Sequence, residues 1–143
     1  MNPNTRVRLS AANARKLIDH ALKELPNEAC GLLGGTEENG IRDVKEVYLL
    51  RNTDASPEHF SLDPREQLAV IRDMREKGLR PLGNWHSHPA TPSRPSEEDI
   101  RLAYDSTATY MILSLESKTV PNLNAFQIRD GTVEWEILEL YDE

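Results

Sequence analysis

The sequence has little cysteine, a deficit of basic charge and no long hydrophobic run. Its single cysteine, Cys30, has no partner for an internal disulfide. No apolar stretch approaches the roughly 20 residues that a transmembrane helix needs. The first residues, 1–6, are not followed by the apolar core of a signal peptide. We therefore expect a cytoplasmic protein.

Basic residues are outnumbered: Lys and Arg total 17, Asp and Glu total 24, and the formal net charge is −7. Non-specific nucleic-acid binding needs a basic surface that neutralises phosphates, and this balance argues against it. The same charge argues against binding to an anionic membrane surface. We expect neither nucleic acid nor membrane as a partner. The 143 residues suffice for one hydrophobic core, which predicts a single domain over 1–143.

Helix and strand patterns alternate along the chain. They predict helices over 10–25, 64–77 and 96–105, strands over 30–35, 41–50, 81–88, 109–115, 123–129 and 132–140, and a loop over 51–63 with a short strand near 59–62. Asn39-Gly40 and Asp130-Gly131 are hairpin turn signals, and antiparallel hairpins exclude a purely parallel sheet. The elements predict an α/β fold with a mixed sheet.

A short motif concentrates residues with metal-binding chemistry. His86 and His88 stand two residues apart in a predicted strand, so their side chains point to one face while Ser87 points away. Asp99 follows eleven residues later. Two histidines and a carboxylate are a typical ligand set for catalytic zinc. An ordinary interpretation is compatible with this: Ser96 and Asp99 have the spacing of a capping box at a helix start.

Other metal folds with similar motifs do not fit. A cupin also uses H-x-H, but it needs another histidine well downstream, and none follows His88. A zinc deaminase needs P-C-x-x-C, which the single cysteine excludes. The H-E-x-x-H helix of another protease class is absent as well.

The full spacing, H-x-H-P-x5-P-S-x2-D, is much more specific than its parts. It resembles the signature of the JAMM/MPN+ zinc metalloproteases, and every signature position is filled here. The resemblance covers nearly the whole chain and implies a single MPN (JAB/JAMM) domain, with a mixed sheet sandwiched by helices in a cytidine-deaminase-like fold. It also implies one Zn²⁺ per chain, held by His86, His88 and Asp99 together with a bound water.

The same resemblance assigns catalytic roles. The family's general base is a glutamate just before a Gly-Leu-Leu-Gly-type strand, and Glu28 holds that position. Taken alone, Glu28 would be a solvated residue after a helix; with the downstream motif, it is expected to take a proton from the zinc-bound water and pass it to the leaving amine. Ser96 resembles the family's oxyanion-stabilising serine. For Cys30 we expect packing, with a catalytic role left open.

The expected substrate also follows from the resemblance. Family members cut the amide or isopeptide bond after the C-terminal Gly-Gly tail of ubiquitin-like proteins. The compact chain is similar to the Mec group of CysO-cysteine peptidases, which implies release of cysteine from a sulfur-carrier protein in cysteine biosynthesis. We expect the tail to add as a strand beside the zinc, with the 51–63 loop as a wall. An isopeptidase acting on protein lysines, a non-catalytic MPN scaffold, a metal-binding module and a homodimer stay open.

Overall fold

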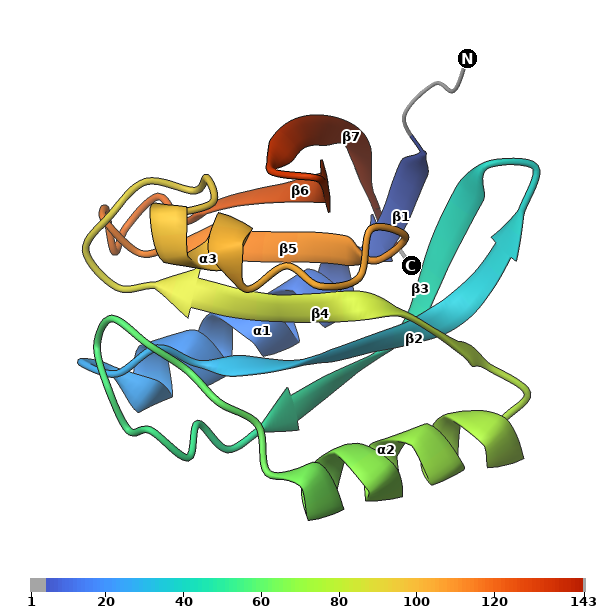
Figure 1. Cartoon of the computed structure of the whole chain (residues 1–143), viewed down its shortest axis with the longest axis horizontal. Helices are drawn as coiled ribbons and strands as arrows, with labels where there is room; N and C mark the ends of the chain where they lie inside the picture. The colour runs from blue at the N-terminus through green and yellow to red at the C-terminus, as the bar shows by residue number, and fades with distance from the viewer. Residues whose placement is uncertain (1–4, 143) are drawn as a thin grey trace.

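The computed structural model describes residues 5–142, so residues 1–4 and 143 of the predicted domain lie outside the described residues. The elements, in chain order, are β1 (Arg6–Ser10), α1 (Ala11–Glu24), β2 (Cys30–Glu38), β3 (Ile41–Leu50), α2 (Pro64–Glu76), β4 (Arg80–His88), α3 (Glu97–Arg101), β5 (Thr109–Ser114), β6 (Asn122–Arg129) and β7 (Thr132–Tyr141) (Figure 1). Within the described residues, no helix combines the length and apolarity needed to cross a membrane.

The strands form a closed barrel in the order β1-β3-β2-β4-β5-β6-β7. Closure depends on β1, which pairs in parallel with both β3 and β7. The predicted mixture of strand directions is confirmed, because β4 and β5 are parallel while the hairpins are antiparallel. The expected sheet sandwiched by helices differs from the structure in one respect, because its strands close into a barrel. The cytidine-deaminase-like arrangement stays a prediction.

Three local differences separate the structure from the sequence pattern. β1 was not predicted, because its five residues run directly into the N-cap of α1 at Ser10. The short strand expected near 59–62 does not form. α3 ends at Arg101, whereas the predicted helix continued to residue 105. Each involves a short segment in which only a few residues carry the periodic signal.

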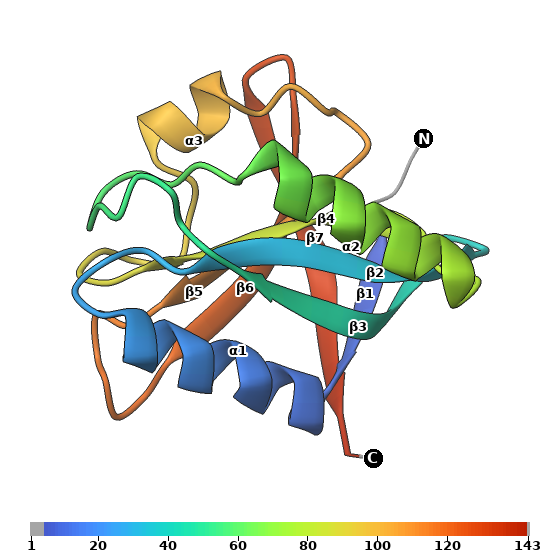
Figure 2. The ribbon, with the colours of Figure 1, turned by 90° about the horizontal axis from the view of Figure 1, so that it is seen from below.

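Two hydrophobic clusters hold the long helices against the barrel. α1 contributes Leu17 and Ala21, which have no exposed surface, to the larger cluster. α2 packs Met74 against Leu50 at the end of β3 in the smaller cluster. Figure 2 shows α1 and α2 on opposite sides of β2. The helices therefore support β2 and its neighbour β4 from both faces.

Trp85 holds the strand that carries the two histidines. Its side chain has no exposed surface and belongs to the larger cluster, as its alternation with the histidines predicts. The indole Nε1–H donates to the Tyr48 carbonyl of β3 at 3.0 Å. The bond passes over Gly31 of β2, where a Cβ would overlap both Nε1 and the Tyr48 carbonyl oxygen. β4 is thus locked to β3 beside the candidate site.

Candidate metal centre and active site

The end of β4 and the start of α3 bring three predicted site residues together. The Nε2 atoms of His86 and His88 lie 3.2 Å apart. Asp99 Oδ2 lies 3.2 Å from His86 Nε2 and 3.1 Å from His88 Nε2. The three side chains are 3%, 5% and 14% exposed. The predicted metal ligands therefore form one compact, buried cluster.

The distances within this cluster fit the tetrahedral coordination of a metal cation. Zinc binds nitrogen and oxygen at about 2.0–2.1 Å, so two ligand atoms of a tetrahedral site lie about 3.3 Å apart. The observed separations are close to that value. His88 is also oriented as a ligand: its Nδ1 lies 2.8 Å from the Pro92 carbonyl, which favours the proton on Nδ1 and leaves the Nε2 lone pair facing the cluster. In the described part of the chain, no second group of His, Cys, Asp and Glu gathers this way.

Asp99 is held as a carboxylate by its surroundings. Burial would raise the pKa of its carboxyl, but the hydrogen bonds with His86 and His88 bring it well below its usual range. The same Oδ2 accepts the Ser96 backbone N–H at 2.9 Å, while the Ser96 hydroxyl accepts the Asp99 N–H at 3.0 Å. The predicted capping box is confirmed. It rigidly aims the carboxylate at the two histidines.

Glu28 lies beside the cluster in the segment between α1 and β2. It is 5% exposed and lines a cavity of about 510 Å³ together with His88 and Ser96. The alternative of a solvated residue after a helix is therefore wrong. Burial raises the pKa of the Glu28 carboxyl to about 8, and the field of His88 partly opposes this rise. A cation held by the cluster would act in the same direction as His88 and lower the pKa of Glu28.

The loop over 51–63 contacts the cluster through an aromatic ring that sequence reasoning missed. The Phe60 ring stacks on the His86 ring, with the ring centroids 4.7 Å apart. The neighbouring His59 Nδ1 lies 2.7 Å from Glu98 Oε1 in α3, and this hydrogen bond raises the pKa of His59. The loop thus reaches both elements that carry the cluster. No local pattern distinguishes Phe60 from a core aromatic residue, since its partner His86 lies in β4, far from this loop in the sequence.

Two cavities adjoin the cluster. One, of about 360 Å³, lies on the His86 side and is lined by apolar side chains that include Phe60 and Leu102. The other, of about 510 Å³, lies on the His88 side and contains Glu28. A chain that passes from one cavity to the other would cross the cluster.

Cys30 fits the packing role. It lies opposite His86 in the β2–β4 pairing, so the two side chains share a face of the sheet. It has no exposed surface, and burial raises the pKa of its thiol to about 12. A nucleophilic cysteine needs a lowered pKa, so Cys30 is not placed for catalysis.

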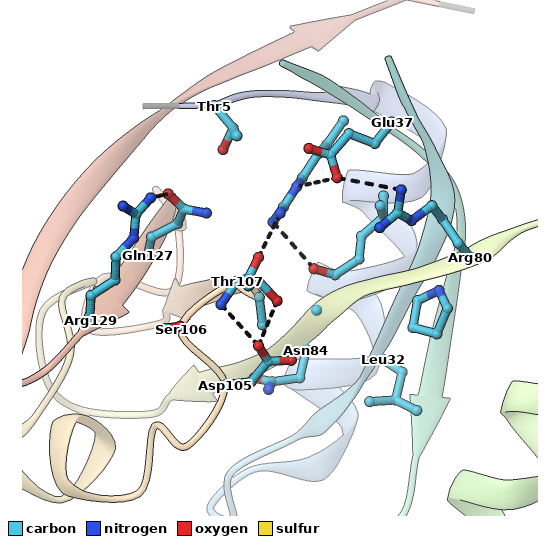
Figure 3. Close-up of a pocket in the computed structure, with 15 residues that line it drawn as sticks. Thr5, Leu32, Glu37, Arg80, Asn84, Asp105, Ser106, Thr107, Gln127 and Arg129 are labelled. Atoms are coloured by element: carbon cyan, nitrogen blue, oxygen red, sulfur yellow. Dashed lines mark hydrogen bonds and ion pairs between the residues drawn. The ribbon is translucent and has the colours of Figure 1, made fainter. Parts of the chain in front are cut away.

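A larger pocket, of about 700 Å³, lies at the other end of β4, where the strand begins (Figure 3). Its β4 residues are 80–84, and Asn84 also lines the cavity of about 360 Å³ on the His86 side. Each charged group of its walls has a partner: Arg42 and Arg80 pair with Glu37, Asp105 accepts from Thr107, and Arg129 donates to Gln127 and pairs with Glu134 outside the lining. We interpret this pocket as a layer of paired polar side chains at one end of the barrel. We place the candidate site at the end of β4 that carries the histidines.

β7 carries a buried carboxyl group on the inner face of the barrel. Glu136 is 5% exposed, and the nearby Thr109 hydroxyl and Arg42 guanidinium only partly offset the cost of burying its carboxylate. Burial raises the pKa of its carboxyl from 4.5 to about 7. The unfolded chain releases this proton near pH 4.5 and the folded protein near pH 7. Glu136 therefore lowers the free energy of unfolding as the pH rises through that window.

Glu136→Gln should be more stable than the wild type at high pH only. One pKa unit corresponds to about 1.4 kcal/mol, so the expected gain reaches about 3 kcal/mol above pH 7 and vanishes near pH 4. Denaturant unfolding over this pH range measures it. Glu134→Gln, a partly exposed change on the same strand, is the control and should keep the wild-type pH slope. Parallel pH profiles for the wild type and E136Q would contradict the prediction.

The fold and the cluster agree with a match to a known family. Residues 10–129 match the family described as prokaryotic homologs of the JAB domain. The chain therefore belongs to the prokaryotic JAB-domain family, a compact branch of the JAMM/MPN proteins, as the histidine motif predicted.

Two characterised relatives and one solved structure resemble the chain over most of its length. The chain is 33% identical over 138 residues to the CysO-cysteine peptidase of Mycobacterium tuberculosis (strain ATCC 25618 / H37Rv), with 96% of this chain and 91% of that protein covered. It is 31% identical over 121 residues to the desampylase of Haloferax volcanii, covering 80% of this chain and 86% of that protein. The solution structure of protein DSY2949 from Desulfitobacterium hafniense superposes with a TM-score of 0.90 at 49% identity, covering 96% of this chain and 94% of that one.

Proposed function

We propose that this protein is a zinc metallopeptidase that hydrolyses the amide or isopeptide bond after the C-terminal Gly-Gly tail of a ubiquitin-like or sulfur-carrier protein. The observation that carries the proposal is the buried Glu28 beside three ligand atoms at tetrahedral spacing. In this function His86, His88 and Asp99 hold Zn²⁺. The relatives named as a peptidase and a desampylase support a hydrolase.

The chemistry divides between the metal and the protein. When bound, Zn²⁺ supplies a Lewis acid that polarises the scissile carbonyl and lowers the pKa of water from about 15.7 towards about 7. Glu28 takes a proton from the attacking water while the new C–O bond forms. It gives that proton to the amine nitrogen as the C–N bond breaks, which releases a carboxylic acid and an amine.

The position of Glu28 orients the substrate. Because Glu28 protonates the leaving amine, the amine side occupies the cavity on the His88 side, which Glu28 lines. The Gly-Gly tail then occupies the cavity on the His86 side, next to Phe60. Glycine has no side chain, so it suits the approach beneath an aromatic ring that already contacts His86.

Ser96→Ala is expected to lower kcat by about 10²–10³-fold, the usual effect of removing one oxyanion donor. The Ser96 oxygen accepts the Asp99 N–H as a helix cap, so its own proton is free to donate to the substrate carbonyl oxygen. Loss of the cap costs about 1 kcal/mol of stability, and zinc content shows whether it also disturbs the proposed ligand Asp99. Measuring kcat and the free energy of unfolding in S96A separates the catalytic role from the capping role. S96T is the control, since threonine keeps a hydroxyl that can serve in both. A wild-type kcat in S96A would remove Ser96 from the mechanism.

Among substrates, we propose release of cysteine from a sulfur-carrier adduct as the physiological reaction. The match to the CysO-cysteine peptidase, which covers 96% of this chain, supports it. The desampylase match supports the alternative, cleavage of an isopeptide bond at a protein lysine. A non-catalytic scaffold is disfavoured because the ligand set and Glu28 are assembled and buried. The cytoplasmic location and a homodimer stay predictions.

A cleavage assay read by intact mass tests the function. The substrates are a ubiquitin-like sulfur carrier ending Gly-Gly-Cys and a Gly-Gly–lysine isopeptide conjugate, each with zinc and with chelator. Chelator-sensitive loss of the terminal cysteine alone supports the sulfur-carrier reaction. Cleavage of the isopeptide alone makes the protein a deconjugating protease. No cleavage of either substrate by the zinc-loaded protein would overturn the proposed function.

A further inference from the structure

The backbone that carries Glu28 belongs to no helix or strand. It lies between the end of α1 at Glu24 and the start of β2 at Cys30, so no regular ladder fixes the proposed base. The hydrogen bonds that hold this segment come from β4 and from the loop over 51–63. They involve two buried polar side chains, Ser87 and Asn52, to which the sequence assigned no role.

Ser87 stands between the two cluster histidines and holds the residue after the base. Its side chain has no exposed surface. Its hydroxyl oxygen accepts the Ala29 N–H at 2.8 Å, and its backbone N–H donates to the Ala29 carbonyl at 3.0 Å. The segment that carries the base is thus bonded directly to the strand that carries two of the proposed ligands.

Asn52 holds Glu28 itself from the loop. It is 6% exposed, and its Nδ2 donates to the Glu28 carbonyl at 3.0 Å and to the His59 carbonyl at 2.9 Å. Its Oδ1 accepts the backbone N–H groups of Asp54 at 3.0 Å and Ser61 at 3.2 Å. Nδ2 also lies 3.5 Å from the Ser56 carbonyl, so one buried amide contacts five backbone groups.

We propose that Asn52 and Ser87 form a clamp that positions Glu28 against the metal cluster. This rests on the function proposed for Glu28. A general base must lie within hydrogen-bond reach of the proton it takes, and a misplacement of about 1 Å can cost about 10²-fold in rate. Both residues are positioning residues, because their polar groups contact the backbone at Glu28 and Ala29 and not the reacting atoms.

The clamp also couples the base to the wall of the site. Asn52 holds the His59 carbonyl, and the side chains of His59 and Phe60 reach Glu98 and His86. Because these contacts start from two consecutive loop residues, the amide that fixes Glu28 also fixes the ring above the cluster. An asparagine that only stabilised the loop over 51–63 would not contact the Glu28 carbonyl.

Asn52→Ala tests the clamp against a matched change in the same loop, Thr53→Ala. Thr53 is exposed, and its hydroxyl donates to the Ser61 carbonyl at 3.1 Å, away from Glu28. We expect N52A to lower kcat by about 10²-fold, with KM changed less and zinc content unchanged, and T53A to keep the wild-type kcat. Equal losses in the two variants, a wild-type kcat in N52A, or loss of zinc from N52A would each overturn the clamp.

Ser87→Ala and Ser87→Thr test the second half of the clamp. Alanine removes the acceptor of the Ala29 N–H, whereas threonine keeps a hydroxyl at that position. The alanine variant should lose kcat as N52A does, and the threonine variant should recover it. If S87T is as impaired as S87A, the hydroxyl is not the group that positions the base.

Hydrogen exchange separates the clamp from the proposed function, because it needs no substrate. The Ala29 amide, which donates to the Ser87 hydroxyl, should exchange faster in S87A than in T53A and the wild type. The Glu28 amide, which donates to the Ser56 carbonyl that Asn52 Nδ2 also contacts, should exchange faster in N52A. If the wild type cleaves no tail substrate while these amides lose protection, the proposed function fails and the clamp stands. If the wild type turns over and protection is unchanged in both variants, the clamp fails.

Discussion

Glu28→Ala should abolish measurable turnover while one zinc stays bound. A general base contributes about 10²–10⁴-fold, and in the proposed mechanism the same carboxylate also delivers the proton to the leaving amine. The three proposed ligands do not include Glu28, so its truncation leaves their cluster intact. Intact-mass assays measure turnover, and elemental analysis of the same samples measures zinc. Glu28→Gln, which keeps the shape without the base, should be equally inactive.

The control for this prediction is an acidic residue in the strand that follows Glu28. Glu38 ends β2 and is exposed, so Glu38→Gln should keep wild-type turnover. If E28A loses its zinc together with its activity, Glu28 acts as a ligand or a structural group and the assigned role is wrong. A substantial kcat in E28Q would show that another group carries the proton.

His88→Ala should remove both the zinc and the turnover. His88 Nε2 lies 3.2 Å from His86 Nε2 and 3.1 Å from Asp99 Oδ2, so its loss leaves two ligands where a catalytic zinc site ordinarily has three. Elemental analysis should find zinc in the wild type and almost none in the variant. The wild type should lose activity in chelator and recover when zinc is returned. Because bound metal stabilises the folded state by mass action, the chelated wild type should also show a lower Tm.

The matched control is another histidine outside the cluster. The His20 ring in α1 meets the Trp85 ring edge-on, with centroids 6.1 Å apart, and His20 is not part of the cluster. His20→Gln should therefore keep its zinc even if its stability falls. Full activity of the wild type after exhaustive chelation, with no metal detectable, would exclude a zinc mechanism for this chain.

The parts of the site that the sequence predicted correctly depend on short-range geometry. His86 and His88 share a face because strand side chains alternate with a period of two. Ser96 and Asp99 form a capping box because an N-cap and an N3 residue lie one helical turn apart. Such relations need only a few neighbouring residues, so the pattern of types and spacings is enough to predict them.

The parts that the sequence did not predict depend on contacts between distant segments. The five residues of β1 close the barrel only because β3 and β7 offer them edges on both sides. Phe60 meets His86, and Asn52 meets Glu28, across loops whose path no local pattern specifies. An asparagine after a strand is an ordinary loop residue until the fold buries it.

The sequence by itself determined the types and spacing of the proposed ligands, the glutamate before the glycine-rich strand and the mixed α/β composition, because alternation, capping and turn preferences act within a few residues. Only the tertiary structure decided that the strands close, that Glu28 stands beside the histidines, and that burial raises its pKa to about 8. The physical reason is that strand pairing and the exclusion of water are collective. They depend on segments far apart in the chain, and a residue's neighbours in sequence do not specify them.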